Sequence, residues 1–226
     1  MDIEYFKLAH SLNEGYKHIL LKDKVHFRAS LNSISLISIS DEKPELGVKC
    51  NANNYKSTDN IDIILQDINK IKIKSNPKRV TSEKKLQSWI INYALNNNYQ
   101  LPFGTNIKFI TSELAIRNKS GKKIVTDILG YCVRENKLCV IELKSVRLLK
   151  LLIQQVSNFE EIILKNFDFF SKLLSVNDFS NNKPLSKEVK KIIVWPYKPT
   201  SAKKELKEAD ILEFTYQEHY IFKNYS

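Results

Sequence analysis

The sequence predicts a mixed α/β (α+β) protein with a small N-terminal part and a larger C-terminal part. Apolar residues recur at helical spacing in some segments and alternate with polar residues, as in strands, in others. A polar segment with one proline, residues 75–79, interrupts this pattern a third of the way along the chain. We therefore expect an accessory domain over residues 1–75 and a second domain over residues 76–226.

The first third reads as a small α/β unit. Residues 3–21 carry apolar side chains at helical spacing, and residues 25–40 alternate in a way typical of one or two strands. Residues 46–50 fit another strand, and residues 61–73 fit either a strand or a helix. None of these segments contains a catalytic motif, so DNA binding, protein contact and dimerisation are all open for this part.

The remaining chain predicts the order helix, three strands, helix, strand. Ser82 is a suitable N-cap for the first helix, because its hydroxyl can accept a hydrogen bond from the first turn. The expected elements are a helix from residue 82, strands at 107–116, 124–133 and 138–144, a long helix at 148–170, a strand at 192–195, and a final helix–strand pair within 201–223.

Positive charge is concentrated in the C-terminal part. The net charge is +11 in all. Residues 1–75 hold 11 Lys and Arg against 10 Asp and Glu, whereas residues 76–226 hold 25 against 15. A positive surface attracts polyanions, so nucleic acid is the natural partner. The alternative is a Lys-rich and Asn-rich composition without a binding role.

Other classes of protein are disfavoured. No apolar run approaches the ~20 residues that span a bilayer, and the acidic N-terminus is not a secretory signal. We therefore expect a cytoplasmic protein without membrane contact. Cys50, Cys132 and Cys139 form no CxxC pair and no zinc-ligand spacing, so we expect free thiols.

Three charged residues stand out in the second and third strands of the C-terminal part. Glu142 and Lys144 share one face of the third strand, whereas the opposite face is apolar. Asp127 is the lone carboxylate of the second strand, and pairing through the turn at 134–137 would bring it near Glu142. Buried like charges repel, and a divalent cation such as Mg²⁺ removes that cost. The pattern predicts a metal site with a lysine beside it.

The long helix that follows adds an amide to this pattern. Gln155 falls on the apolar stripe formed by residues such as Leu152 and Phe159. A buried amide needs hydrogen-bond partners, and a neighbouring metal site with its waters would supply them.

Together these residues resemble the PD-(D/E)XK nuclease superfamily, in particular its RecB-like or NucS-like nuclease domains. The resemblance covers roughly residues 81–196 and rests on Asp127, Glu142-Leu143-Lys144 and Gln155. The chain departs from the family pattern in two places: Thr126 stands where a proline often precedes the aspartate, and Phe159 replaces the tyrosine of a QxxxY-like motif.

The resemblance implies a restriction-endonuclease-like αβββαβ core and a nuclease that uses Mg²⁺ or Mn²⁺. Asp127, Glu142 and the Leu143 carbonyl would bind the metal, and Lys144 would assist the attacking water. Gln155 would support the site. DNA is the expected substrate, and a homodimer is common among such enzymes. A role in defence or in DNA repair is consistent with the resemblance.

Two further carboxylates compete for one acidic role. Glu83 sits where the glutamate of the family's first helix would fall, but it can equally interact with the helix dipole. Glu113, on the first strand, is the other candidate, and its alternative is a solvent-facing side chain. The functional alternatives are a non-catalytic nucleic-acid-binding or assembly module with the nuclease fold, and an RNA-cleaving defence or toxin effector.

Overall fold

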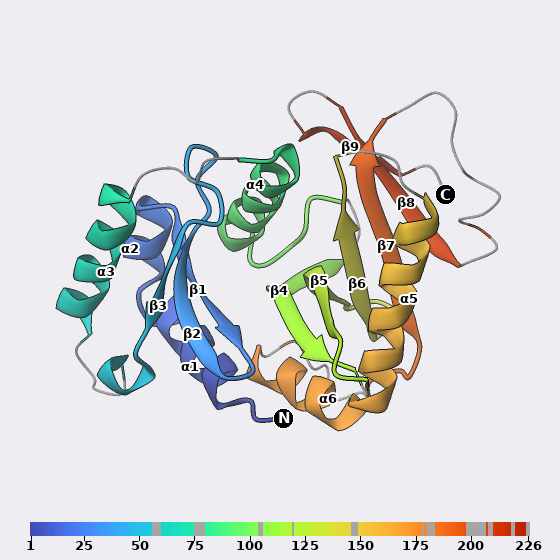
Figure 1. The fold of residues 1–226 in the computed structure, drawn as a ribbon, viewed down its shortest axis with the longest axis horizontal. Helices are drawn as coiled ribbons and strands as arrows, with labels where there is room; N and C mark the ends of the chain where they lie inside the picture. The colour runs from blue at the N-terminus through green and yellow to red at the C-terminus, as the bar shows by residue number, and fades with distance from the viewer. Residues whose placement is uncertain are drawn as a thin grey trace. The chain divides into compact units, whose positions relative to one another are not determined.

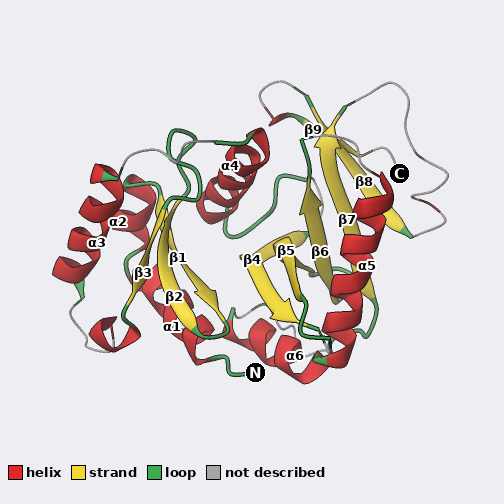
Figure 2. Cartoon of the chain, in the orientation of Figure 1, coloured by secondary structure: helices red, strands yellow, loops and turns green. Residues whose placement is uncertain are grey.

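The computed structural model describes residues 1–55, 60–74, 80–103, 106–118, 120–145, 149–177, 179, 184–197, 207, 210–217 and 220–224. Within these residues the protein is mixed α/β, with two sheets and six α-helices (Figures 1 and 2). None of the described helices combines the length and apolar character that crossing a bilayer requires.

The chain divides into two compact units, Met1–Asn96 and Asn97–Ser226, called the N-terminal and C-terminal units below. The boundary expected at residues 75–79 lies outside the described residues. The division at Asn96 places the helix that begins at Ser82 in the N-terminal unit.

The N-terminal unit contains a three-stranded antiparallel sheet in the order β1-β2-β3. Its elements are α1 (Glu4–Gly15), α2 (Lys17–Lys22), β1 (Val25–Ser30), β2 (Ser33–Ser38), β3 (Gly47–Cys50), a 3₁₀ turn η1 (Ala52–Tyr55), α3 (Ile61–Ile73) and α4 (Ser82–Asn96). The strands expected over residues 25–40 and 46–50 are confirmed. The helix expected over residues 3–21 is interrupted at Tyr16.

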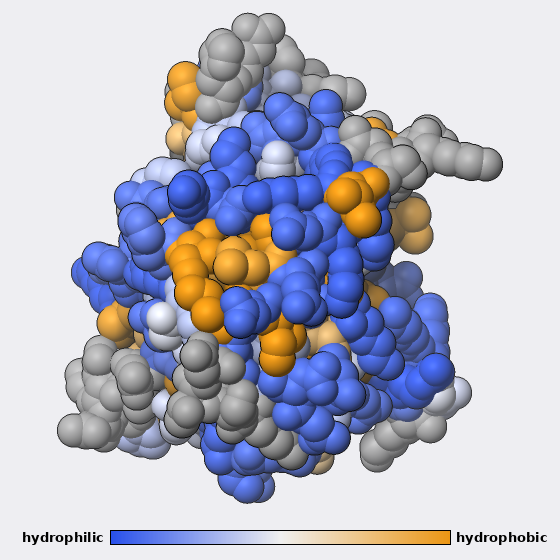
Figure 3. Space-filling model, turned by 90° about the vertical axis from the view of Figure 1, so that its left-hand side faces the viewer, coloured by the Kyte–Doolittle hydropathy of each residue, from blue (hydrophilic) through white to orange (hydrophobic). Residues whose placement is uncertain are grey.

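Segment 61–73, which fitted a strand or a helix, is the helix α3. Ile64, Ile68 and Ile71 recur at spacings of four and three and are buried, which explains the choice. The same helix exposes Ile61, Leu65 and Ile73. Figure 3, which views the protein from the side where α3 lies, shows apolar side chains gathered on this surface.

A side chain of α1 fastens that helix to the sheet of the N-terminal unit. The amide of Asn13 donates to the carbonyl oxygen of Phe27 on β1 and accepts from the Phe27 N–H, at 2.8 Å each. Phe6, Ala9 and Leu12 form the buried side of α1. The core of this unit therefore combines apolar burial with backbone groups satisfied by a side-chain amide.

The C-terminal unit is built on a six-stranded sheet in the order β4-β5-β6-β7-β8-β9. Its elements are β4 (Ile107–Arg117), β5 (Lys123–Cys132), β6 (Lys137–Leu143), α5 (Leu149–Lys165), α6 (Phe167–Val176), β7 (Val189–Pro196), β8 (Ile211–Tyr216) and β9 (Phe222–Asn224). β4, β5 and β6 are antiparallel, whereas β6, β7 and β8 run parallel. The expected strands at 107–116, 124–133, 138–144 and 192–195 are confirmed. The final helix–strand pair was expected within 201–223. Strand β8 lies in this range, whereas residues 201–206 and 208–209 lie outside the described residues.

The single helix expected over residues 148–170 is wrong, because the chain forms α5 and α6 with Asn166 between them. Asn166 has φ −123° and ψ 35°, outside the helical region. Its side-chain amide donates to the Ile162 carbonyl at 2.8 Å. Asparagine side chains that bond nearby backbone groups compete with helix continuation. Both helices bury an apolar stripe, so the periodicity gave no sign of the break.

Helix α5 lies along one face of the six-stranded sheet (Figure 1) and contacts β5, β6 and β7. The face is identified by an ion pair of 3.3 Å between Glu160 of α5 and Lys191 of β7. Ile193, two residues further on, shares that face. Because Ile193 is the register partner of Glu142 on β6, Glu142 also lies there. We call this side of the sheet the helix-covered face.

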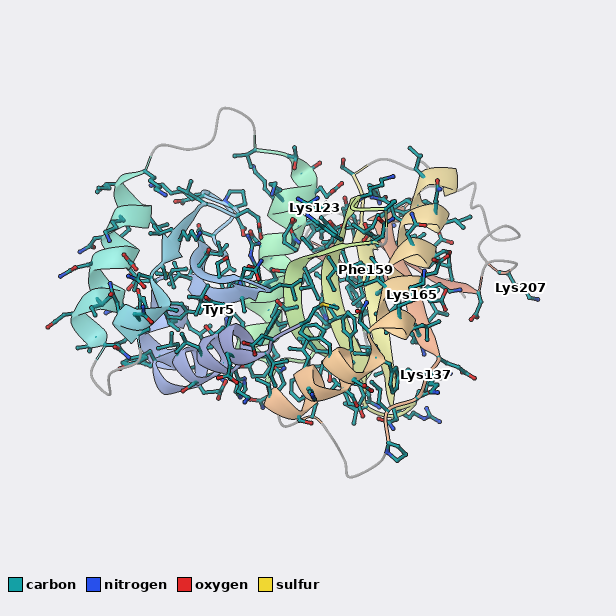
Figure 4. All side chains as sticks on the ribbon, turned by 60° about the horizontal axis from the view of Figure 1, so that its bottom comes forward. Tyr5, Lys123, Lys137, Phe159, Lys165 and Lys207 are labelled. Carbon is teal, nitrogen blue, oxygen red and sulfur yellow. The ribbon has the colours of Figure 1, made fainter. Side chains whose placement is uncertain are left out.

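The buried side of α5 consists of residues spaced three or four apart. They are Leu152, Val156, Phe159 and Ile163. Phe159, labelled in Figure 4, lies on the sheet side of the helix and packs edge-on to Phe170 of α6.

The three cysteines are buried and free, as expected.

Candidate active site

Asp127 and Glu142 stand at the point where β5 and β6 stop pairing. The last pair of this ladder is Ile128 with Ile141, so Asp127 and Glu142 are the next residues on each strand. The Leu143 N–H donates to Asp127 Oδ2 at 2.7 Å. A side chain thus replaces the backbone partner at this position, and the carboxylate is fixed against β6.

Lys144 joins the two carboxylates. Its Nζ lies 3.4 Å from Asp127 Oδ2 and 3.5 Å from Glu142 Oε2. It also donates to the Leu143 carbonyl oxygen at 2.8 Å. Its backbone N–H donates to the Val194 carbonyl at 2.9 Å, which holds the end of β6 against β7. Asp127, Glu142, Leu143 and Lys144 therefore form one cluster.

Glu142 is the most buried charged group of this cluster, with a side chain only 1% exposed. Its Oε1 is buried and has no hydrogen-bond partner among the described residues. Burial raises the pKa of the Glu142 carboxyl well above its usual range, and the nearby Asp127 carboxylate raises it further, whereas Lys144 acts in the opposite direction. An orphaned carboxylate oxygen in such a place is the kind of atom that a cation would satisfy.

Glu113 lies opposite Asp127 in the β4–β5 register. Its neighbours Ser112 and Leu114 pair with Ile128 and Thr126. Its φ is +52°, and among the described non-glycine residues it is the only one with positive φ inside a strand. Such a conformation costs on the order of 1–3 kcal/mol and tends to occur at functional sites. The strand register thus places Glu113, Asp127 and Glu142 at successive positions across β4, β5 and β6.

Gln155 is exposed, so its expected burial on the apolar stripe of α5 is wrong. The stripe is centred on Leu152, Val156 and Phe159, and Gln155 lies at its edge. Because Gln155 follows Leu152 by three residues, its amide lies beside the apolar stripe and not between the helix and the sheet. The predicted supporting role of Gln155 stays a prediction.

Glu83 lies in the first turn of α4, within the N-terminal unit. This is the position at which a carboxylate interacts favourably with the helix dipole. Its role in the site stays a prediction.

Sequence reasoning missed one buried carboxylate on the helix-covered face. Glu213 on β8 is the register partner of Ile193 and is 4% exposed. The Trp195 indole N–H donates to its Oε1 at 2.6 Å. The signal was present, because Glu213 is a lone carboxylate among apolar residues of its strand, as Asp127 is. The indole N–H thus supplies a hydrogen-bond donor to one oxygen of this buried carboxylate.

The donor set of the cluster fits a hard divalent cation. Among the described residues, no group of three or more His, Cys, Asp or Glu side chains could hold a metal ion. Within the cluster itself, the oxygen donors are the carboxylates of Asp127 and Glu142 and the Leu143 carbonyl. Mg²⁺ commonly takes only one or two protein carboxylates and keeps several waters. The buried Glu142 Oε1, which has no hydrogen-bond partner in the described part of the chain, provides one such oxygen.

Comparison with known proteins gives no family assignment: no family model and no curated protein matches this chain.

Proposed function

We propose that the protein is a metal-dependent nuclease that hydrolyses phosphodiester bonds, with DNA as its substrate. The observation that carries the proposal is the convergence of Asp127, Glu142 and Lys144 at the end of one β-ladder. Two carboxylates can hold a divalent cation that activates a water, and a lysine beside them can offset the negative charge that develops on the phosphate. The net charge of +10 over residues 76–226 suits a polyanionic substrate.

Each group of the cluster has a distinct part in this proposal. Asp127, Glu142 and the Leu143 carbonyl would hold Mg²⁺ or Mn²⁺. The bound ion would polarise the phosphate and lower the pKa of a water. The Lys144 ammonium would donate to the attacking water or to the phosphate oxygens and offset developing negative charge. The Leu143 N–H fixes the orientation of Asp127 throughout.

The element order supports a PD-(D/E)XK core. Helix α4, strands β4 to β6, helices α5 and α6 and strand β7 follow one another along the chain, which is an αβββαβ order with the second helix divided in two. Asp127 and Glu142 lie on the second and third of these strands. We propose this family on that order and on the residues of the cluster.

The second candidate is a nucleic-acid-binding module that keeps the fold without catalysis. Two observations favour it: Gln155 is exposed, and the part of the chain that the structure describes has no group of three or more His, Cys, Asp or Glu side chains that could hold a metal ion. The buried Glu142 weighs against it, because a binding module has no need of an orphaned carboxylate in its sheet.

A cleavage assay separates the candidates. The purified protein is incubated with single-stranded, nicked and branched DNA, and with RNA in parallel, in Mg²⁺, Mn²⁺ or EDTA. We expect the parent protein to cut DNA only when the metal ion is present. The Asp127→Ala and Lys144→Ala variants should lose this activity, whereas the Glu213→Gln variant should keep it. Absence of cutting on every substrate, or variants as active as the parent, would refute the nuclease. Cutting of RNA alone would support the effector alternative.

A further inference from the structure

The β4–β5 hairpin continues beyond the point where β6 stops pairing with β5. The β5–β6 ladder ends at Ile128, whereas the β4–β5 ladder extends to the pair Arg117 and Lys123. Residues 114–118 and 120–126 therefore belong to a two-stranded ribbon with a turn at its end. We call this ribbon the hairpin arm.

The two faces of the hairpin arm differ in character. On one face the side chains of Leu114, Ile116 and Thr126 are buried. The other face carries the half-buried pair Ala115 and Val125 and then the exposed pair Arg117 and Lys123. The face that meets solvent thus begins with small or short apolar side chains and ends with two cations.

The solvent-exposed face of the hairpin arm is continuous with the candidate active site. Every second residue of a strand points to the same side of the sheet. Lys123, Val125 and Asp127 of β5 therefore share one side. Lys123 lies four positions before Asp127, which corresponds to about 14 Å along a strand at about 3.4 Å per residue. In Figure 4, Lys123 lies toward one end of the sheet and Lys137 toward the other.

The hairpin arm is strongly basic. Residues 114–126 contain four Lys and Arg and no Asp or Glu. Arg117, Lys122 and Lys123 are exposed, and none of them forms an ion pair with a described residue. These cations are therefore available to a partner with negative charge.

The turn of the hairpin arm is held by its own hydrogen bonds. Asn118 Oδ1 accepts from the backbone N–H groups of Ser120 and Lys122 at 3.1 and 2.9 Å. Gly121 has φ +78°, which glycine adopts without strain. Arg117 donates to the Gly121 carbonyl at 2.8 Å. Binding to such a preorganised turn would lose little conformational entropy.

We propose that the hairpin arm binds duplex DNA beside the active site, with Arg117 and Lys123 on backbone phosphates. The inference rests on the proposed nuclease function and deepens it. A strand of duplex DNA carries one phosphate per about 3.4 Å of helix axis, so the arm spans roughly four nucleotides from the site. A two-stranded ribbon fits the major groove of B-form DNA, whereas the major groove of A-form RNA is too narrow.

Fluorescence anisotropy with a short labelled DNA duplex tests this in EDTA, where binding is read without cleavage. Affinity is measured over a range of NaCl concentrations for the parent, for Arg117→Ala/Lys123→Ala, and for Arg117→Lys/Lys123→Arg. The matched control is Lys172→Ala/Lys187→Ala, which removes two exposed cations from α6 and from the segment before β7. Thermal melting confirms that each variant is folded.

Loss of two phosphate contacts should lower the slope of log K against log salt concentration by about 2 in magnitude. The charge-retaining variant and the control should keep the parent slope. The inference is overturned if the parent does not bind duplex DNA, if the alanine variant keeps the parent slope, if the control loses as much, or if duplex RNA binds as tightly. Duplex binding that depends on the hairpin arm, without any cleavage, would support DNA binding by the arm and refute the proposed nuclease activity. Metal-dependent cleavage together with an unchanged salt slope in the alanine variant would support the nuclease activity and refute DNA binding by the arm.

Discussion

Replacing Glu142 by glutamine should make the metal-free protein more stable, although it removes a carboxylate from the proposed active site. Glu142 and Asp127 contact the same lysine ammonium at 3.5 and 3.4 Å, so their carboxylate oxygens lie no further apart than these distances together. Even at this upper limit of about 7 Å, two negative charges repel by about 2 kcal/mol at an effective dielectric constant of about 20, and a shorter separation increases the repulsion. Glutamine keeps the shape of the side chain and removes the charge.

The sign of the effect follows from the pKa of Glu142. Burial and Asp127 together outweigh the attraction of Lys144, because the pKa of the carboxyl is raised well above its usual range. Between the unfolded and the folded pKa, the folded protein binds a proton that the unfolded chain has released. Folding stability is therefore lost as pH rises through this window.

The size of the effect is bounded by the same linkage. One pKa unit corresponds to about 1.4 kcal/mol. The advantage of Glu142→Gln should be absent below pH ~4 and grow by at most about 1.4 kcal/mol per pH unit above it. At pH 7 it can reach no more than about 4 kcal/mol.

Urea unfolding in EDTA at several pH values, followed by the fluorescence of the buried Trp195 in the same sheet, measures this advantage. Glu213→Gln is the matched control, because it removes a buried carboxylate with an indole donor. It should lose about 1–3 kcal/mol of stability. Adding Mg²⁺ at 100 times its dissociation constant should stabilise the parent by about 2.7 kcal/mol and the Glu142→Gln variant by much less. The reasoning fails if Glu142→Gln is destabilised at pH 7, or if Mg²⁺ stabilises both proteins equally.

Three further predictions concern Lys144, His26 and Asn13. Lys144→Met leaves Asp127 and Glu142 without their shared cation. It should therefore lower the unfolding free energy of the metal-free protein by about 3–5 kcal/mol at pH 7 and by less at pH 5. An equal loss at both pH values would contradict this prediction. Burial, assisted by Arg28, lowers the pKa of His26 to about 3. As pH falls below ~6.5, the unfolded chain therefore takes up a proton at His26 before the folded protein does. The unfolding free energy of the parent, measured by urea unfolding, should fall by about 2 kcal/mol between pH 6.5 and 5 because of this residue. The His26→Gln variant should not show this loss. Asn13→Ala leaves the Phe27 backbone groups without their amide partner and should reduce stability by about 1–3 kcal/mol, whereas exposed Asn96→Ala should change thermal melting little.

The residues of the candidate site could be located from the sequence because their signal is local. Alternation along β5 and β6 showed that Glu142 and Lys144 share a face and that Asp127 is a lone carboxylate in an apolar strand. A short turn between two strands implies antiparallel pairing, so the approach of Asp127 to Glu142 could also be expected. Each of these inferences needs only residues within one hairpin.

Features that depend on distant pairing or on backbone geometry could not be predicted. The alignment of Glu213 with Glu142 passes through β7, and parallel register is set by packing rather than by a connecting turn. The positive φ of Glu113 leaves no mark in the composition of its strand. The exposure of Gln155 depends on which residues of α5 the sheet reaches, which periodicity resolves only to within one neighbouring position.

The position of the cluster at the end of the β5–β6 ladder explains how one sheet can hold an orphaned carboxylate and an open face together. Up to Ile128 and Ile141 the ladder satisfies its own backbone groups, and α5 covers the side chains. Beyond that pair the Leu143 N–H turns to the Asp127 carboxylate. Asp127 therefore lies between two parts of β5. On one side β5 pairs with β6 in the ladder, and on the other side it continues into the basic hairpin arm. A polyanion that follows the arm toward the sheet would reach Asp127 and Lys144, which are partly exposed, before it reached the buried Glu142.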